Sequence, residues 1–420
     1  MARKRRGLIG LALAGGGPEG AVWEIGALRA LDEAIEGIDL NELDVYVGVS
    51  AGAFLAANLA NNLTTAQMCR AIVKHDPGEH PFTPETFFTP AVGEFFRRGV
   101  SVPKLLFEAV AGFAANPRDR SLADSLTRMS RALPVAVFDN EPIRQYLRTI
   151  YTMKGRTDDF RKLDHELYVI AADLDRGVPV IFGSPGLDHV AISRAIQASS
   201  ALPGLYPPVE IDDRRIVDGV LLKTLHASVA LDQGVKLLFA FNPIVPVDVS
   251  RAHLTELEAH GGLHGDPPKS NGNGAAGEFD LERRGLPTVL SQTFRTLIHS
   301  RLTVGMKQYE TRYKDADVVL FEPDREDTKM FFTNIFSFSA RRRVAAHAYR
   351  SVRRDLRERC DEIGPVLERH GLRLRCHVLE DESRDLWEGV GLPREDGVTP
   401  TRQTLHRLDR ALDRIERLLR

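Results

Sequence analysis

The sequence predicts an α/β fold with a largely parallel central sheet flanked by helices, followed by an α-helical C-terminal region. Residues 7–14, 45–49 and 167–172 are short apolar runs with the length and composition of buried strands. Each of the first two runs is followed by glycine and then by a helical pattern. Because this order is typical of βα units, we expect the chemistry to lie at the carboxyl ends of the strands.

Further apolar runs at residues 178–182, 215–217 and 235–241 extend the predicted sheet. Residues 76–134 interrupt it with short helical pieces broken by proline and glycine, and they hold seven of the 20 phenylalanines. We therefore expect residues 8–250 to form one domain, with residues 76–134 inserted as a helical cap.

The remainder of the chain is predicted to consist of a linker and a helical region. Residues 261–277 have almost no apolar content, so they cannot offset the entropy of ordering, and we expect a flexible loop or linker over residues 259–284. Residues 285–420 are expected to be helical and to pack on the core. Their last segment carries an apolar stripe that must be buried against the core or against a second copy of the chain, formed by Leu405, Leu408, Leu412, Ile415 and Leu419.

Composition excludes several classes of function. Lys and Arg number 56 against 58 Asp and Glu, so no global positive field indicates a nucleic-acid partner. The three cysteines show no ligand spacing, which predicts neither a zinc site nor a disulfide framework and favours a reducing compartment. No run approaches the ~18 apolar residues of a membrane span. We expect a cytoplasmic location, any membrane contact being peripheral.

A G-x-S-x-G pattern lies between a predicted strand and a predicted helix. Gly48 and Gly52 flank Ser50, directly after the run at residues 45–49 and at the start of a helical pattern over residues 51–63. This is the context of a nucleophile elbow, in which small neighbours let strand and helix approach and the serine stands at a helix N-terminus. A plain strand-to-helix turn is the alternative.

A second glycine cluster follows the first predicted strand. Gly15, Gly16 and Gly17 expose backbone N–H groups, and Pro18 suits the first turn of the helix that follows. The spacing matches neither a dinucleotide-binding fingerprint with its acidic partner nor a Walker A motif, so no nucleotide cofactor is predicted. The cluster is either an oxyanion-binding turn or a purely structural one.

Asp218 ends an apolar strand in the segment Arg-Ile-Val-Asp-Gly. A carboxylate there could accept the proton of a serine if burial raised its pKa. Most Asp-Gly pairs are only turns.

Taken in order, these three motifs resemble the patatin-like phospholipase family, whose pattern is a glycine-rich turn, G-x-S-x-G and a downstream Asp-Gly. Similar segments lie at residues 138–142, 172–174 and above all 198–208, Ala-Ser-Ser-Ala-Leu-Pro-Gly-Leu-Tyr-Pro-Pro. The resemblance spans about residues 8–245. It implies a patatin-like three-layer catalytic domain over residues 8–250.

The resemblance also implies a Ser-Asp dyad that hydrolyses fatty-acyl esters of phospholipids or glycerides, without metal or cofactor. Ser50 would attack the ester, Asp218 would take its proton, and amides of the turn at residues 15–17 would bind the oxyanion. His226 is the nearest candidate for a triad histidine and is expected to be structural. The family usually has Arg or Lys where this chain has Glu19, which leaves a non-catalytic lipid-binding or regulatory protein as the alternative. If Glu19 faced the turn, its replacement by Arg would raise activity on anionic lipid.

Overall fold

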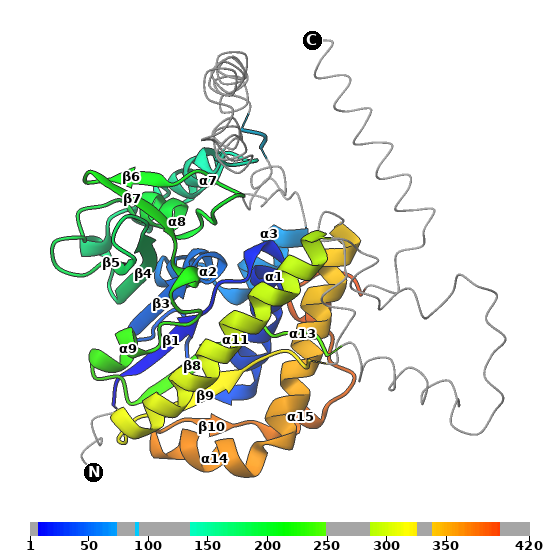
Figure 1. Cartoon of the computed structure of the whole chain (residues 1–420). Helices are drawn as coiled ribbons and strands as arrows, with labels where there is room; N and C mark the ends of the chain where they lie inside the picture. The colour runs from blue at the N-terminus through cyan, green and yellow to red at the C-terminus, as the bar shows by residue number, and fades with distance from the viewer. Residues whose placement is uncertain (1–6, 74–88, 92–134, 249–285, 326–337, 395–420) are drawn as a thin grey trace, which may run out of the picture.

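The computed structural model describes residues 7–73, 89–91, 135–248, 286–325 and 338–394 (Figure 1). Apart from residues 89–91, the predicted cap at residues 76–134 lies outside the described residues. The predicted linker at residues 259–284 and the apolar stripe at residues 405–419 also lie outside them.

An eight-stranded mixed sheet forms the centre of the molecule. Its strands follow the order β6-β7-β4-β3-β1-β8-β9, and β5 pairs with β4. The strands are β1 (Ile9–Leu13), β3 (Val45–Val49), β4 (Glu166–Asp173), β5 (Val178–Phe182), β6 (Val209–Ile211), β7 (Arg214–Asp218), β8 (Leu237–Phe241) and β9 (Asp317–Phe321). All pairings among β4, β3, β1, β8 and β9 are parallel, whereas β5, β6 and β7 pair antiparallel. The prediction of a largely parallel sheet is confirmed.

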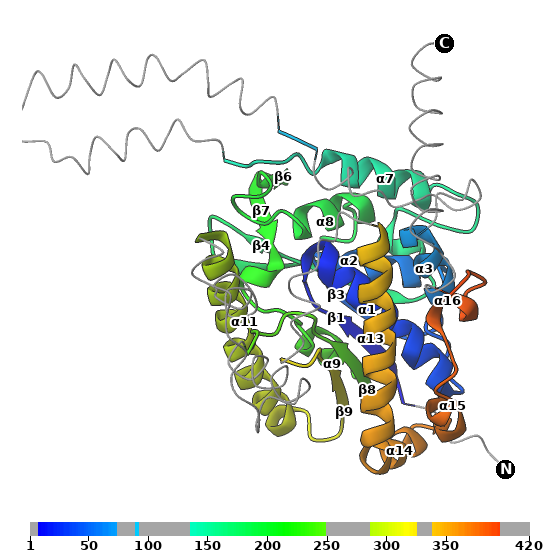
Figure 2. The same cartoon turned by 90° about the vertical axis from the view of Figure 1, so that its right-hand side faces the viewer.

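Helices cover both faces of the sheet, which gives three layers (Figure 2). Successive side chains of a strand point to opposite faces, so Leu11 and Leu13 of β1 join one apolar core while Ala12 and Ala14 join the other. The first core includes α1 (Gly17–Ala34), α2 (Ala51–Ala60), α3 (Thr65–Val73), α7 (Glu141–Tyr151), α8 (Ile192–Ser199), α13 (Phe338–Glu358) and α14 (Cys360–Arg369). The second includes α9 (Ser228–Asp232) and α11 (Leu286–Arg312).

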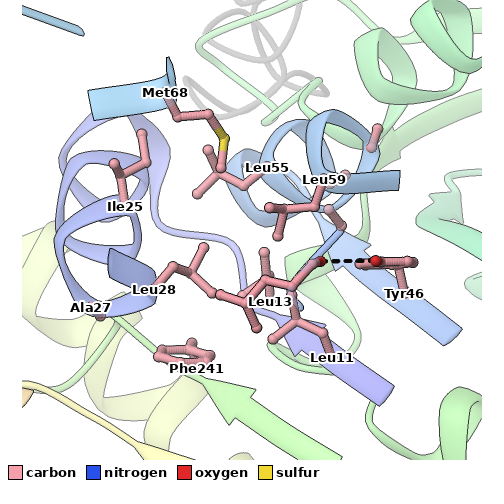
Figure 3. Close-up of a cluster of buried hydrophobic side chains, with 14 of the residues drawn as sticks. Leu11, Leu13, Ile25, Ala27, Leu28, Tyr46, Leu55, Leu59, Met68 and Phe241 are labelled. Atoms are coloured by element: carbon pink, nitrogen blue, oxygen red, sulfur yellow. Dashed lines mark hydrogen bonds between the residues drawn. The ribbon is translucent and has the colours of Figure 1, made fainter. Parts of the chain in front are cut away.

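Figure 3 shows the first core where β1 meets the helices. Leu11 and Leu13 point toward Leu28 of α1 and Leu59 of α2, and Phe241 of the neighbouring strand β8 closes one end. All of these side chains are buried. This packing fixes the ends of β1 and β3, from which the glycine turns leave the sheet.

The C-terminal region has the expected helices, and it also contributes strands that the sequence did not predict. β9 pairs in parallel with β8 and covers an edge that β8 would otherwise expose. A second, two-stranded sheet joins β10 (Arg373–Leu374) to β2 (Ile35–Glu36), and two short helices, α15 (Cys376–Glu380) and α16 (Leu386–Gly389), follow. These strands escape prediction because they are short and are stabilised by partners far away in the sequence.

The arginine-rich helix α13 packs along α1 through its apolar stripe. Ala345, Ala348, Val352 and Leu356 are all buried. The stripe is therefore not available to a membrane surface. In the described part of the chain, no helix is long and apolar enough to cross a bilayer.

Gly26 of α1 permits the close approach of α13. A Cβ atom at Gly26 would lie 2.2 Å from the carbonyl oxygen of Ala345, well inside van der Waals contact. We expect Gly26→Ala to lower the free energy of unfolding by about 1–3 kcal/mol, because the gain in helix propensity is smaller than the cost of separating two packed helices.

Chemical denaturation would measure this effect. Gly305→Ala in α11 is the matched control, since a Cβ there meets nothing closer than 3.9 Å and should leave stability unchanged or slightly raised. Equal stability of the two variants would show that the α1–α13 contact tolerates a side chain.

Candidate active site

Ser50 occupies a strained turn between β3 and α2. Its backbone angles are φ 52° and ψ −120°, a region that residues other than glycine rarely adopt. A Cβ atom at Gly48 would lie 2.4 Å from the Cα of Ala53, and one at Gly52 would lie 2.4 Å from the carbonyl oxygen of Leu13. Both glycines are therefore required by close backbone contacts, as a nucleophile elbow demands.

Ser199 of α8 holds this turn in place. Its Oγ accepts a hydrogen bond from the Ser50 N–H at 2.8 Å and donates one to the carbonyl oxygen of Ile170 at 2.6 Å. The Ser199 side chain is fully buried, so both bonds are shielded from water. The segment 198–208 is one of those on which the family resemblance rests. The sequence did not reveal that Ser199 within it holds the backbone of Ser50 in place.

Asp218 ends β7 and faces Ser50. Its Oδ1 accepts the N–H of Val220 at 2.9 Å, and Ser50 lines the same cavity and lowers the pKa of this carboxyl. A Cβ atom at Gly219 would lie 2.5 Å from the carbonyl oxygen of Ile170, so only glycine lets the chain turn here against β4. The structure brings together two residues that are far apart in the sequence.

Burial controls the ionisation of Asp218. The residue is only 2% exposed, and burial raises the pKa of its carboxyl to about 7, while the hydrogen bonds from Val220 and Ser50 act in the opposite direction. A carboxyl group with this pKa is partly ionised at neutral pH and is a stronger base than an ordinary aspartate.

The glycine turn after β1 lies beside Ser50. A Cβ at Gly15 would lie 3.2 Å from the Cβ of Ser50, and one at Gly16 would lie 2.7 Å from Cγ of Pro243. Gly17 has a φ of 59° and begins α1. Because the first N–H groups of a helix have no intrahelical acceptor, these amides can bind an anion next to the serine.

One cavity of about 240 Å³ joins these elements. Ser50, Asp218, Gly16 and Gly17 all line it. One wall is apolar and comes from α2, α7, α8 and the loop after α8, through Phe54, Ile143, Ile196, Leu202, Leu205 and Tyr206. The other wall comes from α11, through Ser291, Phe294 and Arg295.

Glu19 pairs with α11. Its carboxylate lies 3.6 Å from the Arg295 guanidinium, in the first turn of α1. Burial raises the pKa of Glu19 to about 7, and the charge of Arg295 opposes that shift. Arg295 lines the described cavity and Glu19 does not. In Glu19→Arg the new guanidinium group would lie beside that of Arg295 and the two would repel each other, so the change would do more than add positive charge to the turn. Sequence reasoning did not find Arg295, which carries no motif.

His226 lies at a different cavity. It has a φ of 47° and lines a space of about 300 Å³ between residues 222–226 and α11. Burial lowers the pKa of His226 to about 4, while a hydrogen bond with the backbone of Gly219 acts in the opposite direction. Since Ser50 does not line this space, the geometry gives His226 no place in a triad.

Cys69 and Cys360 are poor candidates for a competing nucleophile. Burial raises the pKa of Cys69 to about 12, so its thiolate is scarce at neutral pH. The sulfur atoms of Cys360 and Cys376 lie 3.0 Å apart, and this contact raises the pKa of Cys360 to about 11. Within the described ranges, no cluster of three or more His, Cys, Asp or Glu could hold a metal ion.

A serine at a strained strand-to-helix turn, beside a buried carboxylate, is an arrangement typical of serine hydrolases. The sequence model of the patatin-like phospholipase family matches residues 11–231, more than half of the 420 residues. The chain belongs to the patatin-like phospholipase family. Membership implies lipid acyl hydrolase activity.

Two similar solved structures come from bacterial proteins. VipD from Legionella pneumophila is 13% identical, with 87% of this chain and 80% of that chain covered and a TM-score of 0.31. ExoU from the type III secretion system of Pseudomonas aeruginosa, in complex with SpcU, is 15% identical, with 73% and 53% covered and a TM-score of 0.27. At these TM-scores the likeness carries no argument about the site.

Proposed function

We propose that the protein is a serine lipid acyl hydrolase, which cleaves fatty-acyl esters of phospholipids or glycerides through Ser50 and Asp218. The observation that carries the proposal is that Ser50, the buried Asp218 and the glycine turn all line one cavity. The family to which the chain belongs supports the same reaction class.

The proposed first half-reaction is acyl transfer to Ser50. Asp218 takes the hydroxyl proton as Ser50 Oγ attacks the ester carbonyl, and amides of the turn at residues 15–17 stabilise the oxyanion. The tetrahedral intermediate collapses, the bond to the alcohol breaks, and Asp218 returns the proton to the leaving alcohol. An acyl-enzyme ester remains.

The second half-reaction is hydrolysis of that ester. Asp218 takes a proton from water, whose oxygen attacks the acyl carbonyl, and a second tetrahedral intermediate forms at the same amides. When it collapses, Ser50 Oγ leaves and recovers its proton from Asp218, so that the fatty acid is released and the enzyme returns to its starting state.

Acyl-chain length tests the substrate class. The apolar wall formed by Phe54, Ile143, Ile196, Leu202, Leu205 and Tyr206 would bind a fatty-acyl chain. We expect kcat/KM for nitrophenyl esters to rise from two-carbon to eight-carbon acyl groups, by up to about fourfold for each buried methylene group. A maximum at two to four carbons would instead identify a small-ester hydrolase of the same fold.

The ionisation of Asp218 predicts a pH dependence. Below its pKa of about 7 the carboxyl is protonated and cannot accept the serine proton. For a neutral, soluble ester we expect kcat/KM to fall about tenfold for each pH unit below 7 and to level off above it. Glu19 also has a pKa of about 7, so the profile should be repeated with Glu19→Gln. An acid limb near pH 4 in both proteins would be inconsistent with the assignment of the base.

The alternative of a non-catalytic lipid-binding or regulatory protein depends on Glu19 opposing charge in the oxyanion turn. Contact with Arg295 partly neutralises Glu19, and the carboxyl is absent from the described lining of the cavity. Both observations favour turnover over a binding function.

A further inference from the structure

The catalytic cavity contains a charged side chain with no part in the proposed dyad. Of the described lining residues, Asp218 and Arg295 are the charged ones. Arg295 comes from α11, on the face of the sheet opposite α1 and α2, whereas the apolar wall comes from α2, α7, α8 and the following loop. The cavity thus has a lipophilic wall and a cationic wall, with Ser50 also in its lining.

We propose that Arg295 is a specificity-determining residue, which binds the phosphate of substrates that carry a phosphodiester close to the scissile ester, and that Glu19 positions it. The inference rests on the proposed acyl hydrolase function. In a glycerophospholipid the phosphate lies only a few bonds from the acyl ester, so an ester held at Ser50 leaves the phosphate within the same cavity. A guanidinium group binds phosphate oxygens through paired N–H donors.

Glu19 both orients the guanidinium and competes with the phosphate for it. The two side chains are 3.6 Å apart and each is less than 20% exposed, so their interaction is only weakly screened by water. Arg295 is the charged group that acts on Glu19 among the described residues, and Asp218 is the other charge in the cavity lining. An ionised Glu19 partly neutralises the charge of Arg295, and protonation of Glu19 removes that contribution.

The test compares two soluble substrates with the same acyl chains. Dihexanoyl phosphatidylglycerol carries a phosphodiester and dihexanoylglycerol does not. Arg295→Gln is expected to lower kcat/KM for the phosphatidylglycerol about 10- to 100-fold more than it lowers kcat/KM for dihexanoylglycerol, mainly through KM. Arg295→Lys should fall between the wild type and Arg295→Gln.

Arg312→Gln is the matched control. It changes the same residue type on the same helix, at an exposed position paired with Asp232, and should leave both substrates unaffected. Because Arg295→Gln leaves the Glu19 carboxylate without its cation, the double change Glu19→Gln with Arg295→Gln removes both charges and should show the same loss of preference. Equal losses on the two substrates in both proteins would overturn the proposal.

The Glu19 part of the proposal has its own pH signature. The quantity to follow is kcat/KM for the phosphatidylglycerol divided by kcat/KM for dihexanoylglycerol. The ionisation of Asp218 affects both substrates equally, so it cancels in this ratio. In the wild type the ratio should fall as pH rises from 6 to 8, because Glu19, with its pKa of about 7, gains its negative charge over that range. In Glu19→Gln the ratio should stay flat and high. A falling ratio in Glu19→Gln, or a flat one in the wild type, would show that Glu19 does not modulate the phosphate preference.

Two further readouts separate the sources of failure. Inorganic phosphate at millimolar concentration should not inhibit dihexanoylglycerol hydrolysis, and inhibition relieved by Arg295→Gln would mean that the subsite binds free phosphate instead. A neutral fluorophosphonate probe should label the wild type. Failure to label the wild type would contradict the proposed acyl hydrolase function itself. Labelling without any preference for the phosphatidylglycerol would contradict only the assignment of Arg295.

Discussion

Ser50→Ala is expected to abolish labelling by a fluorophosphonate probe and to lower kcat for ester hydrolysis by about 10⁴-fold or more, because the nucleophile is lost. Labelling followed by mass spectrometry should place the adduct on Ser50 in the wild type. Persistent labelling of Ser50→Ala at another residue would exclude Ser50 as the nucleophile. No labelling of either protein would favour a non-catalytic protein.

A second substitution at the same position separates stability from activity. Ser50 has a φ of 52°, so alanine retains the backbone strain that glycine would relieve. Ser50→Gly should be as inactive as Ser50→Ala but more stable by about 1 kcal/mol in free energy of unfolding. Thermal unfolding of the three proteins would measure this. A Ser50→Gly variant less stable than Ser50→Ala would show that the turn is not strained.

Asp218→Asn is expected to lower kcat by about 10²- to 10⁴-fold, since the amide cannot accept the serine proton. Its oxygen can still accept the hydrogen bond from the Val220 N–H, so the turn after β7 should persist. Steady-state kinetics would measure this. The difference in kcat between the two proteins should be largest above pH 8, where the wild-type carboxylate is ionised.

The thermal stability of the Asp218→Asn variant provides the control, because it shows whether the variant is folded. Burial raises the pKa of Asp218 from 3.8 to about 7, so ionisation of this carboxyl destabilises the folded state; the cost accumulates between these two pH values and stays at its maximum above about 7. The asparagine variant should therefore unfold at the same or a higher temperature than the wild type at pH 8. Unchanged hydrolysis in a fully folded Asp218→Asn protein would rule out this residue as the base.

The central strands were predictable because they are buried on both sides. The apolar run at residues 45–49 coincides with β3, and the run at residues 7–14 contains β1. A parallel strand with helices on both faces must be continuously apolar, and that pattern stands out without any knowledge of its neighbours.

The outer strands lacked such a signal. β9 is partly exposed, and β6 has only three residues. Each is stabilised by hydrogen bonds to a neighbouring strand, β8 for one and β7 for the other. Their composition alone does not distinguish them from loop or helix, so only the assembled sheet decides their conformation.

The sequence by itself determined the family, the central layers and the positions of Gly16, Ser50 and Asp218. Each of these three residues lies at or just after the end of a strand, where the backbone geometry accepts only certain residue types. Tertiary structure decided what surrounds them. Ser199 reaches the Ser50 amide from α8, and Arg295 enters the cavity from α11 against Glu19. Neither contact follows from local pattern, because hydrogen bonding, burial and charge at this site depend on which distant elements pack together.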